Sequence, residues 1–321
     1  MNRFNKWLSS ILHDELQSAL VLIVVAVATL ILSLSPFAQT LVDFTHLKLP
    51  FDMSLRHFAG EWLISIFFLI AGIELRYELS VGSLASFRTA IVPIMSAVFG
   101  MTIPATIYLA LSTEPQAWGV VMPTDLPFAL AVLAIFARSA STEIRAFVIS
   151  LAIVDDALSV VALSATTGQL QIHPSLIAIL VGLSLPIDFG DKVRHLLHPV
   201  STGIVLPLFA ITALAFTVQI ADFFNSQSLP IVISRVIGKP LGILIGALVA
   251  VAVLRARPSI TWRQIAVIGC VCSVGFSVSL LFAANSNLAD AALLQTTAAI
   301  VLAIPLTMAC GALASLFLRH K

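Results

Sequence analysis

Two adjacent aspartates, Asp155 and Asp156, lie in an apolar stretch that has no other charged residue between Arg145 and His173. An ionised carboxylate at the centre of a membrane helix costs about 2.5 to 3.5 kcal/mol on insertion scales. Burial and like-charge repulsion both favour the protonated acid, so such a pair can exchange protons near neutral pH. Hard cations bind the same carboxylate oxygens. The pair therefore indicates a site at which a proton and a cation compete.

The segment VMPTDLPFAL (121–130) predicts a broken helix. Pro123 and Pro127 remove backbone hydrogen bonds around Thr124 and Asp125. Irregular backbone is tolerated at membrane depth only where protein or a water-filled cavity satisfies it. The two half-helices then present end dipoles that act on a nearby ion. The alternative is a simple proline kink in which Asp125 bonds to a neighbour.

Lys239 lies at membrane depth, where a lysine requires a counter-ion. Neighbours on a helix point about 100° apart, so either Asp155 or Asp156 can pair with Lys239 while the other faces Asp125. Arg235, one turn earlier, can snorkel or pair. Three carboxylates against one lysine leave excess negative charge for a cation or protons to neutralise. If such a site opens alternately to each side of the membrane, it performs antiport.

Composition defines the elements that must position these residues. The 321-residue chain is 59% hydrophobic and 10% charged, with a mean hydropathy of +1.06, which is typical of a polytopic membrane protein. Three cysteines without CxxC spacing exclude a disulfide framework or a zinc site. A net charge of +1 excludes a basic surface for nucleic acid. About ten apolar runs of spanning length are centred near residues 26, 66, 100, 128, 155, 179, 210, 243, 274 and 304.

The lysines and arginines indicate the orientation of these spans. Only Lys48 and Arg56 fall on one side, which predicts that the other side and both termini are cytoplasmic. We expect residues 1–17 to form an amphipathic interfacial segment, 18–318 a single transmembrane transport domain, and 319–321 a cytoplasmic tail. The cytoplasmic side holds Arg3, Lys6, Arg76, Arg88, Arg138, Arg145, Lys192, Arg194, Arg255, Arg257, Arg263, Arg319 and Lys321.

The ninth span, GCVCSVGFSVSLLFAAN (269–285), has Gly275 at its centre among serines. Alone, this pattern is ordinary for close helix packing. The fourth and ninth spans are, however, each the middle member of a three-span group, at about 88–166 and 228–318. The two groups begin on opposite sides of the membrane, as an inverted repeat requires. The positions of the two groups therefore indicate an inverted repeat by geometry alone, without convincing residue identity between the halves.

Several stretches together resemble one known family. The chain contains FFLIAGIELRYELSVGSLASFR (67–88), PTDLPFALAVLA (123–134), LAIVDDALSVV (151–161), LLHPV (196–200), LPLFA (206–210), IGKPLGI (237–243) and CSVGFSVSL (272–280). In this order they resemble the NhaA-type sodium/proton antiporters, which are inverted-repeat membrane transporters. The implied fold is all-α, with two inverted three-helix repeats that contain the broken helices.

The resemblance also implies roles for individual residues. Asp156 would be the principal Na⁺ ligand and a proton carrier, and Asp155 would pair with Lys239 and also stand near the metal ion. Thr124 would lend the sodium an oxygen. Asp125 would compensate the positive helix ends at the crossing, and Lys239 the negative ends. The second broken helix would lie around Gly275.

The regulatory residues match the family less closely. His173, His195 and His198 lie where the resemblance implies a pH response, with ordinary polar caps as the alternative. Glu61 replaces an aspartate at the family's cytoplasmic funnel. The family also has about two more helices between the double aspartate and QIHPSLIAILVGLSLP (171–186), so this chain is a shortened member. Pro127 departs from the family's usual residues.

The resemblance implies export of Na⁺ or Li⁺ in exchange for external protons, with more than one proton per sodium, for sodium and pH homeostasis. Such a protein is a secondary transporter of the bacterial inner membrane, not an enzyme, and needs no cofactor. Its expected partners are membrane lipid, sodium ions and protons, and no nucleic acid. Residues 41–53 either form the family's dimerising hairpin, which would bind a second copy of the chain, or are simply a loop. The alternatives are a degenerate relative that senses or assembles, and an intramembrane aspartyl protease using Asp125 with Asp155 or Asp156.

Overall fold

The computed structural model describes residues 15–49, 52–137, 140–166 and 174–318 of the chain. Helices make up most of these residues, and the strands among them are limited to one short pair. The all-α membrane architecture predicted from the sequence is confirmed. The chain forms two compact units, residues 1–76 with 169–220 and residues 77–168 with 221–321, which are described separately. The predicted N-terminal segment lies largely outside the described residues, and the predicted tail wholly outside them.

The first unit contains two long helical segments and a short hairpin. Its two-residue strands pair antiparallel, Lys48 with Ser54 and Leu49 with Met53. Near the hairpin, Arg56 donates a hydrogen bond to the carbonyl oxygen of Ala215. The elements are α2 (Glu15–Ser33), α3 (Ala38–Thr45), β1 (Lys48–Leu49), β2 (Met53–Ser54), α4 (Leu55–His57), η2 (Phe58–Leu63), α5 (Ile64–Ser80, whose last turn enters the second unit), α9 (Pro174–Ser184), α10 (Ile187–Val200), η4 (Ser201–Val205) and α11 (Leu206–Leu214).

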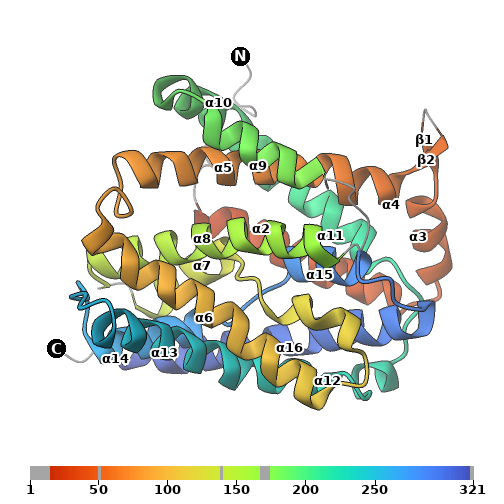
Figure 1. Cartoon of the computed structure of the whole chain (residues 1–321). Coiled ribbons are helices and arrows are strands. Elements are labelled where there is room, and N and C mark those ends of the chain that lie inside the picture. The colour runs from red at the N-terminus through yellow and green to blue at the C-terminus, as the bar shows by residue number, and fades with distance from the viewer. Residues whose placement is uncertain (1–14, 50–51, 138–139, 167–173, 319–321) are drawn as a thin grey trace. The chain divides into compact units, whose positions relative to one another are not determined.

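The second unit holds every residue predicted to bind an ion. Its first three-span group begins with α6, whose 25 residues extend about 37 Å and so exceed the hydrocarbon core. Figure 1 shows α6 beside α13, and these two helices pack closely along their length. The elements are α6 (Phe87–Leu111), η3 (Pro115–Val121), α7 (Leu126–Phe136), α8 (Thr142–Thr166), η5 (Ile220–Phe223, which begins in the first unit), α12 (Ser228–Ile233), η6 (Ser234–Gly238), α13 (Lys239–Ala252), α14 (Trp262–Val271), α15 (Ser277–Ala284) and α16 (Asp290–Leu316).

The number of full-length spans among the described residues is smaller than the ten apolar runs of the sequence. Six helices are long and apolar enough to cross a membrane, or up to eight if each bent helix pair counts as one span. The sixth and ninth runs are represented by the shorter apolar helices Pro174–Ser184 and Trp262–Val271. Residues 167–173, directly before Pro174–Ser184, lie outside the described residues. The helix Trp262–Val271 ends at a break in its span and is therefore shorter than spanning length.

Small residues bring α13 against α6. A Cβ atom at Gly242 would lie 2.3 Å from the carbonyl oxygen of Phe99, and one at Gly246 would lie 2.2 Å from that of Met95. These glycines stand four residues apart, the spacing that allows membrane helices to approach backbone to backbone. This close contact fixes the position of α13, which begins at Lys239, against α6.

A widened turn precedes Lys239. In η6 the backbone follows a π-helical pattern, and the N–H of Lys239 donates to the carbonyl of Ser234 five residues earlier. Pro240 has no N–H and its ring would clash with the carbonyl four residues before it, so a regular α-helix is unfavourable here. π-turns inside helices are frequent at functional sites. This one carries Arg235 and ends directly before Lys239.

Candidate ion-binding site

The fourth span is interrupted between Val121 and Leu126. The 3-10 helix η3 ends at Val121, residues 123–125 belong to no helix or strand, and α7 continues from Leu126 at a bend of 42°. Pro127 lies in the first turn of α7, where a missing N–H costs nothing. Pro123 lies in the non-helical stretch itself. The predicted broken helix is therefore present, and Thr124 and Asp125 are buried in its break, with Asp125 in an extended conformation.

The ninth span is interrupted in a matching way and meets the first break. Helix α14 ends at Val271, and α15 begins at Ser277. The N–H of Asp125 donates a 3.0 Å hydrogen bond to the carbonyl of Val274. The hydroxyl of Thr124 donates one of 3.0 Å to the carbonyl of Cys272. The two breaks thus satisfy part of each other's backbone, as irregular chain at membrane depth requires.

Gly275 permits this approach. A Cβ atom there would lie 2.4 Å from the carbonyl oxygen of Pro123 and 2.3 Å from Nη1 of Arg235. Real Cβ atoms do not approach other heavy atoms so closely. Any side chain at this position would therefore push the two breaks apart.

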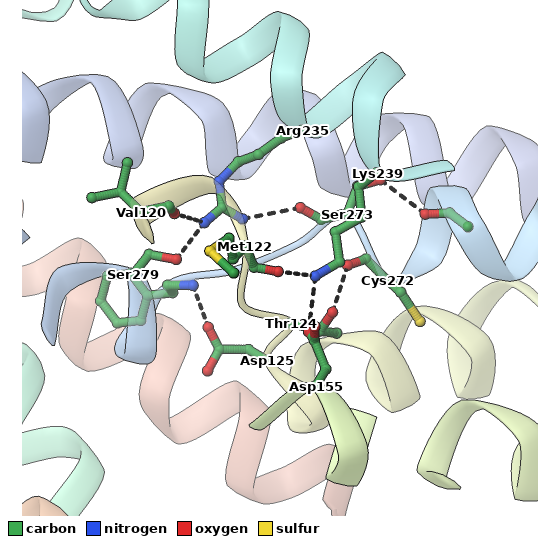
Figure 2. Close-up of polar contacts among 12 residues, drawn as sticks. Val120, Met122, Thr124, Asp125, Asp155, Arg235, Lys239, Cys272, Ser273 and Ser279 are labelled. Carbon is green, nitrogen blue, oxygen red and sulfur yellow. Dashed lines mark hydrogen bonds and ion pairs between the residues drawn. The ribbon is translucent and has the colours of Figure 1, made fainter. Parts of the chain in front are cut away.

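The Asp125 carboxylate caps the second half of the broken ninth span. It accepts hydrogen bonds from the N–H groups of Phe276 and Ser277, the latter at 2.9 Å, and from the Ser277 hydroxyl. The first N–H groups of a helix have no partner within it, and its N-terminus carries partial positive charge. A carboxylate at this point satisfies both requirements. In Figure 2, Asp125 lies on the side of the crossing opposite Arg235 and Lys239.

The adjacent aspartates come from the middle of α8, and one of them forms an ion pair. The ammonium of Lys239 lies 2.8 Å from Oδ2 of Asp155, and both side chains are 1% exposed. Lys239 also donates to the carbonyl of Met122, at the end of η3. Asp156, 4% exposed, is the next residue on α8 and so points about 100° away. The two adjacent carboxylates therefore point in different directions from α8, and Asp155 is the one that pairs with Lys239.

Arg235 is a second buried cation in the same crossing. Its guanidinium donates to the carbonyls of Val120 and Ser273, the latter at 3.2 Å, and to the Ser279 hydroxyl. The two carbonyls lie at the C-terminal ends of η3 and α14, where helix dipoles are negative. Figure 2 shows Arg235 and Lys239 reaching the breaks from one helix. At 1% exposure Arg235 does not snorkel.

This arrangement corrects the charge balance expected from the sequence. Among the described residues, Arg235 is a buried cation in addition to Lys239, and it interacts electrostatically with Asp125 and Asp155. Within the part of the chain that the structure describes, no group of three His, Cys, Asp or Glu side chains forms a preformed metal cage. Oδ1 of Asp155 and Oγ of Ser159, one turn further along α8, are buried oxygens without hydrogen-bond partners among those residues. Oxygens of this kind suit a weakly held, exchangeable cation.

The predicted regulatory residues belong to the first unit or are not described. Nε2 of His57 lies 3.3 Å from a carboxylate oxygen of Glu61, and Nε2 of His195 lies 3.4 Å from one of Asp191. The carbonyl of His198 accepts a hydrogen bond from the Thr202 hydroxyl. His173 lies outside the described residues. A pH response at these positions remains a prediction.

Two residues of the crossing, Arg235 and Ser277, have contacts that the sequence did not predict. The sequence allows Arg235 two alternatives, snorkelling or pairing, although its spacing of four residues from Lys239 places both cations on one helical face. Ser277 was noted only as a small residue near Gly275. Its position directly after the break is the signal that it supplies an N–H and a hydroxyl to a capping acid.

Two interrupted spans that cross at buried charges are characteristic of ion-coupled membrane transporters. A family model described as "Na+/H+ antiporter 1" matches residues 9–183 and 165–316. The chain therefore belongs to the Na⁺/H⁺ antiporter 1 family, which confirms the resemblance of its motifs.

Curated relatives cover most of the chain. It is 29% identical to the Na⁺/H⁺ antiporter NhaA 2 of Clavibacter michiganensis over 343 aligned residues, with 85% of this chain and 83% of the relative covered. It is 28% identical to NhaA 3 of Streptomyces coelicolor, with 98% and 80% covered, and 28% identical to NhaA of Mycolicibacterium smegmatis, with 85% and 79% covered. An alignment of 343 positions that includes only 85% of this 321-residue chain shows that the relative carries residues with no counterpart here.

Proposed function

We propose that this protein is a sodium/proton antiporter that exports Na⁺ or Li⁺ from the cytoplasm in exchange for external protons. The observation that carries the proposal is the ion pair of Asp155 with Lys239, which lies directly beside the buried Asp156 on α8. Family membership and the names of the relatives support the same exchange. The site needs no cofactor, because proton and cation bind the same kind of oxygen.

Asp156 is the proposed exchange group. A Na⁺ ion entering from the cytoplasm binds the ionised carboxylate, and oxygens of Asp155 and Thr124 complete its surroundings. When the site opens to the other side, the sodium leaves and a proton takes its place on the carboxylate. The protonated site then returns inward and releases the proton. The inward proton gradient therefore drives sodium out.

Asp125 and the two cations hold the crossing together during this cycle. Asp125 stabilises the N-terminus of α15, and Lys239 and Arg235 stabilise the C-terminal ends of the other half-helices. In our proposal the residue groups 88–166 and 228–318 are the inverted repeats of one transport domain. Both termini are cytoplasmic, and the membrane is the bacterial inner membrane. The cellular role is sodium and pH homeostasis.

The test is a proton-flux measurement in everted membrane vesicles from a host without its own sodium/proton antiporters. Respiration acidifies the vesicle lumen and quenches a pH-sensitive dye, and NaCl or LiCl is then added. We expect dequenching with the wild-type protein and none with Asp156→Asn. Asp290→Asn removes an exposed carboxylate at the start of α16 and should behave as wild type.

Two other results would change the assignment. A sodium-evoked flux that survives Asp156→Asn would contradict the role of Asp156. No flux at any pH, from folded wild-type protein, would favour the degenerate relative, which the shortened chain makes the second candidate.

The contacts of the aspartates argue against an aspartyl protease. Such a dyad needs two carboxyl groups that share a proton. Here Asp125 accepts hydrogen bonds from Phe276 and Ser277, and Asp155 pairs with Lys239. Both sets of partners stabilise the ionised carboxylate.

A further inference from the structure

Ser159 is a buried serine on the helix that carries the adjacent aspartates. The residue is 0% exposed, and its Oγ has no hydrogen-bond partner among the residues that the structure describes. It follows Asp155 by four residues and Asp156 by three in the middle of α8. Side chains at these spacings are neighbours on the helix surface, with Cβ atoms about 5 to 6 Å apart. The Ser159 hydroxyl therefore lies one helical turn from the proposed exchange group.

A hydroxyl group inside a helix usually has a partner close at hand. It can donate to the backbone carbonyl four residues earlier, as Ser164 does on the same helix at 3.0 Å. At Ser159 that carbonyl belongs to Asp155, and the structure shows no such bond among the described residues. The same backbone bond forms elsewhere at Thr102, Ser273, Thr307 and Ser315. Because a buried polar group normally has a partner, the Ser159 hydroxyl is available to one that binds from outside the chain.

Asp155 presents a second buried oxygen of this kind. Its Oδ2 accepts the 2.8 Å hydrogen bond from Lys239 (Figure 2), whereas its Oδ1 has no hydrogen-bond partner within the described part of the chain. The Oδ1 of Asp155 and the Oγ of Ser159 do not bond to each other, so both are free to contact a third atom. Hard cations bind charged and neutral oxygens together.

We propose that the Ser159 hydroxyl is a further ligand of the transported cation and raises the affinity for sodium. This inference rests on the proposed antiport function, and it adds a neutral oxygen to those of the aspartates and Thr124. A hydroxyl oxygen has two lone pairs and no charge. It can therefore replace one water of the hydration shell of the ion without placing another charge in a buried site.

A buried water is the other occupant that an unpartnered hydroxyl takes. Ser96 on α6 is the matched comparison, because it is also 0% exposed and its Oγ also has no partner among the described residues. A Cβ atom at Gly246 would lie 2.7 Å from the Cα of Ser96. Ser96 therefore packs beside α13 seven residues beyond Lys239, which is about 10 Å along that helix. No Asp, Glu, Lys, Arg or His occurs in residues 89–111 around it.

The test measures sodium-evoked proton flux in everted vesicles at one fixed pH over a range of NaCl concentrations. We expect Ser159→Ala to raise the apparent KM for Na⁺ by about tenfold, as loss of one contact to a charged group does, and to leave Vmax within about twofold of wild type. Ser159→Cys keeps the shape of the side chain, but sulfur is a soft ligand that binds hard cations poorly, so its KM should rise as well. Ser96→Ala should retain the wild-type KM.

Three results would overturn the proposal. An unchanged KM in Ser159→Ala is the result expected of a hydroxyl that holds only a buried water. A wild-type KM in Ser159→Cys would show that the shape of the side chain is sufficient. A raised KM in Ser96→Ala would show that loss of any buried hydroxyl has the effect.

Sodium binding without transport separates failure of this inference from failure of the proposed function. A cation that binds only the folded protein raises its melting temperature in detergent, and the NaCl concentration required should be about tenfold higher for Ser159→Ala. Wild type that exchanges sodium with the same KM as Ser159→Ala retains antiport and rejects the ligand role. Wild type with neither flux nor stabilisation by NaCl rejects both. If Ser159→Ala does not fold, Ser159→Cys decides the question, because it preserves the packing.

Discussion

The N–H of Asp125 donates a 3.0 Å hydrogen bond to the carbonyl of Val274, and this bond joins the two interrupted spans through their backbones. Residues 126–273 separate the two in sequence. The bond places the Asp125 side chain at the first N–H groups of α15, where it accepts three hydrogen bonds. The backbone hydrogen bond between Asp125 and Val274 thus positions the Asp125 carboxylate to cap the N-terminus of α15.

Gly275→Ala should disrupt this crossing. The added methyl would lie 2.4 Å from the Pro123 carbonyl and 2.3 Å from the Arg235 guanidinium. We expect a loss of about 1 to 3 kcal/mol of stability, typical of overpacking, together with loss of sodium-dependent transport. Melting temperature in detergent and vesicle flux measure the two effects.

Gly60→Ala is the matched control, because nothing lies within 4 Å of a Cβ atom at that helical glycine. It should be neutral, or stabilising by up to about 1 kcal/mol. Equal melting temperatures for the two variants would contradict the close approach at Gly275.

Asp125→Ala should destabilise the protein more than Asp125→Asn. Alanine leaves the N–H groups of Phe276 and Ser277 without an acceptor, at about 1 to 3 kcal/mol for each buried donor. Asparagine retains an acceptor oxygen but loses the charge that complements the helix dipole, which costs about 1 kcal/mol. Thermal unfolding of both variants measures the difference. If alanine were the milder change, the cap would not be contributing to stability.

Lys239→Met should be partly rescued by Asp155→Asn. Removing one partner of a buried ion pair leaves an uncompensated charge and costs about 3 to 5 kcal/mol, whereas replacing both partners is often close to neutral. The double variant should therefore melt above the Lys239→Met single variant, although neither should transport normally. Additive losses in the double variant would show that the two side chains do not interact.

The loop before α14, which contains Arg255 and Arg257, should face the cytoplasm together with the C-terminus. The prediction follows from the distribution of basic residues. A C-terminal fusion to green fluorescent protein, which folds on the cytoplasmic side, should fluoresce, and a fusion to periplasmic alkaline phosphatase should be inactive. An inactive green fluorescent protein fusion with an active alkaline phosphatase fusion would contradict the proposed orientation of every span.

The sequence predicted the broken fourth span because two independent signals, prolines and a buried charge, coincide there. It also predicted a partner for Lys239, because a lysine at that depth requires one. It could not assign Arg235, since an arginine within a span either snorkels to the interface or pairs. Which occurs depends on the neighbouring chain: here Val120, Ser273 and Ser279 supply the acceptors.

Helix length was harder to predict from the sequence than helix location. Hydropathy locates apolar runs, but it does not show where a helix stops inside one. The ninth run contains two short helices around a break at 272–276, because Gly275 allows close approach of the other broken span and Asp125 caps the second helix. The capping acid is distant in sequence, so hydropathy does not reveal it.

The central claim is that a sodium ion and a proton compete for Asp156. The most direct test is to add NaCl to purified protein in weakly buffered detergent solution and record the pH. We predict proton release from wild type that saturates with sodium, that LiCl reproduces and KCl does not, and that Asp156→Asn abolishes. Proton release of equal size from folded Asp156→Asn, or none from wild type at any starting pH, would contradict the claim.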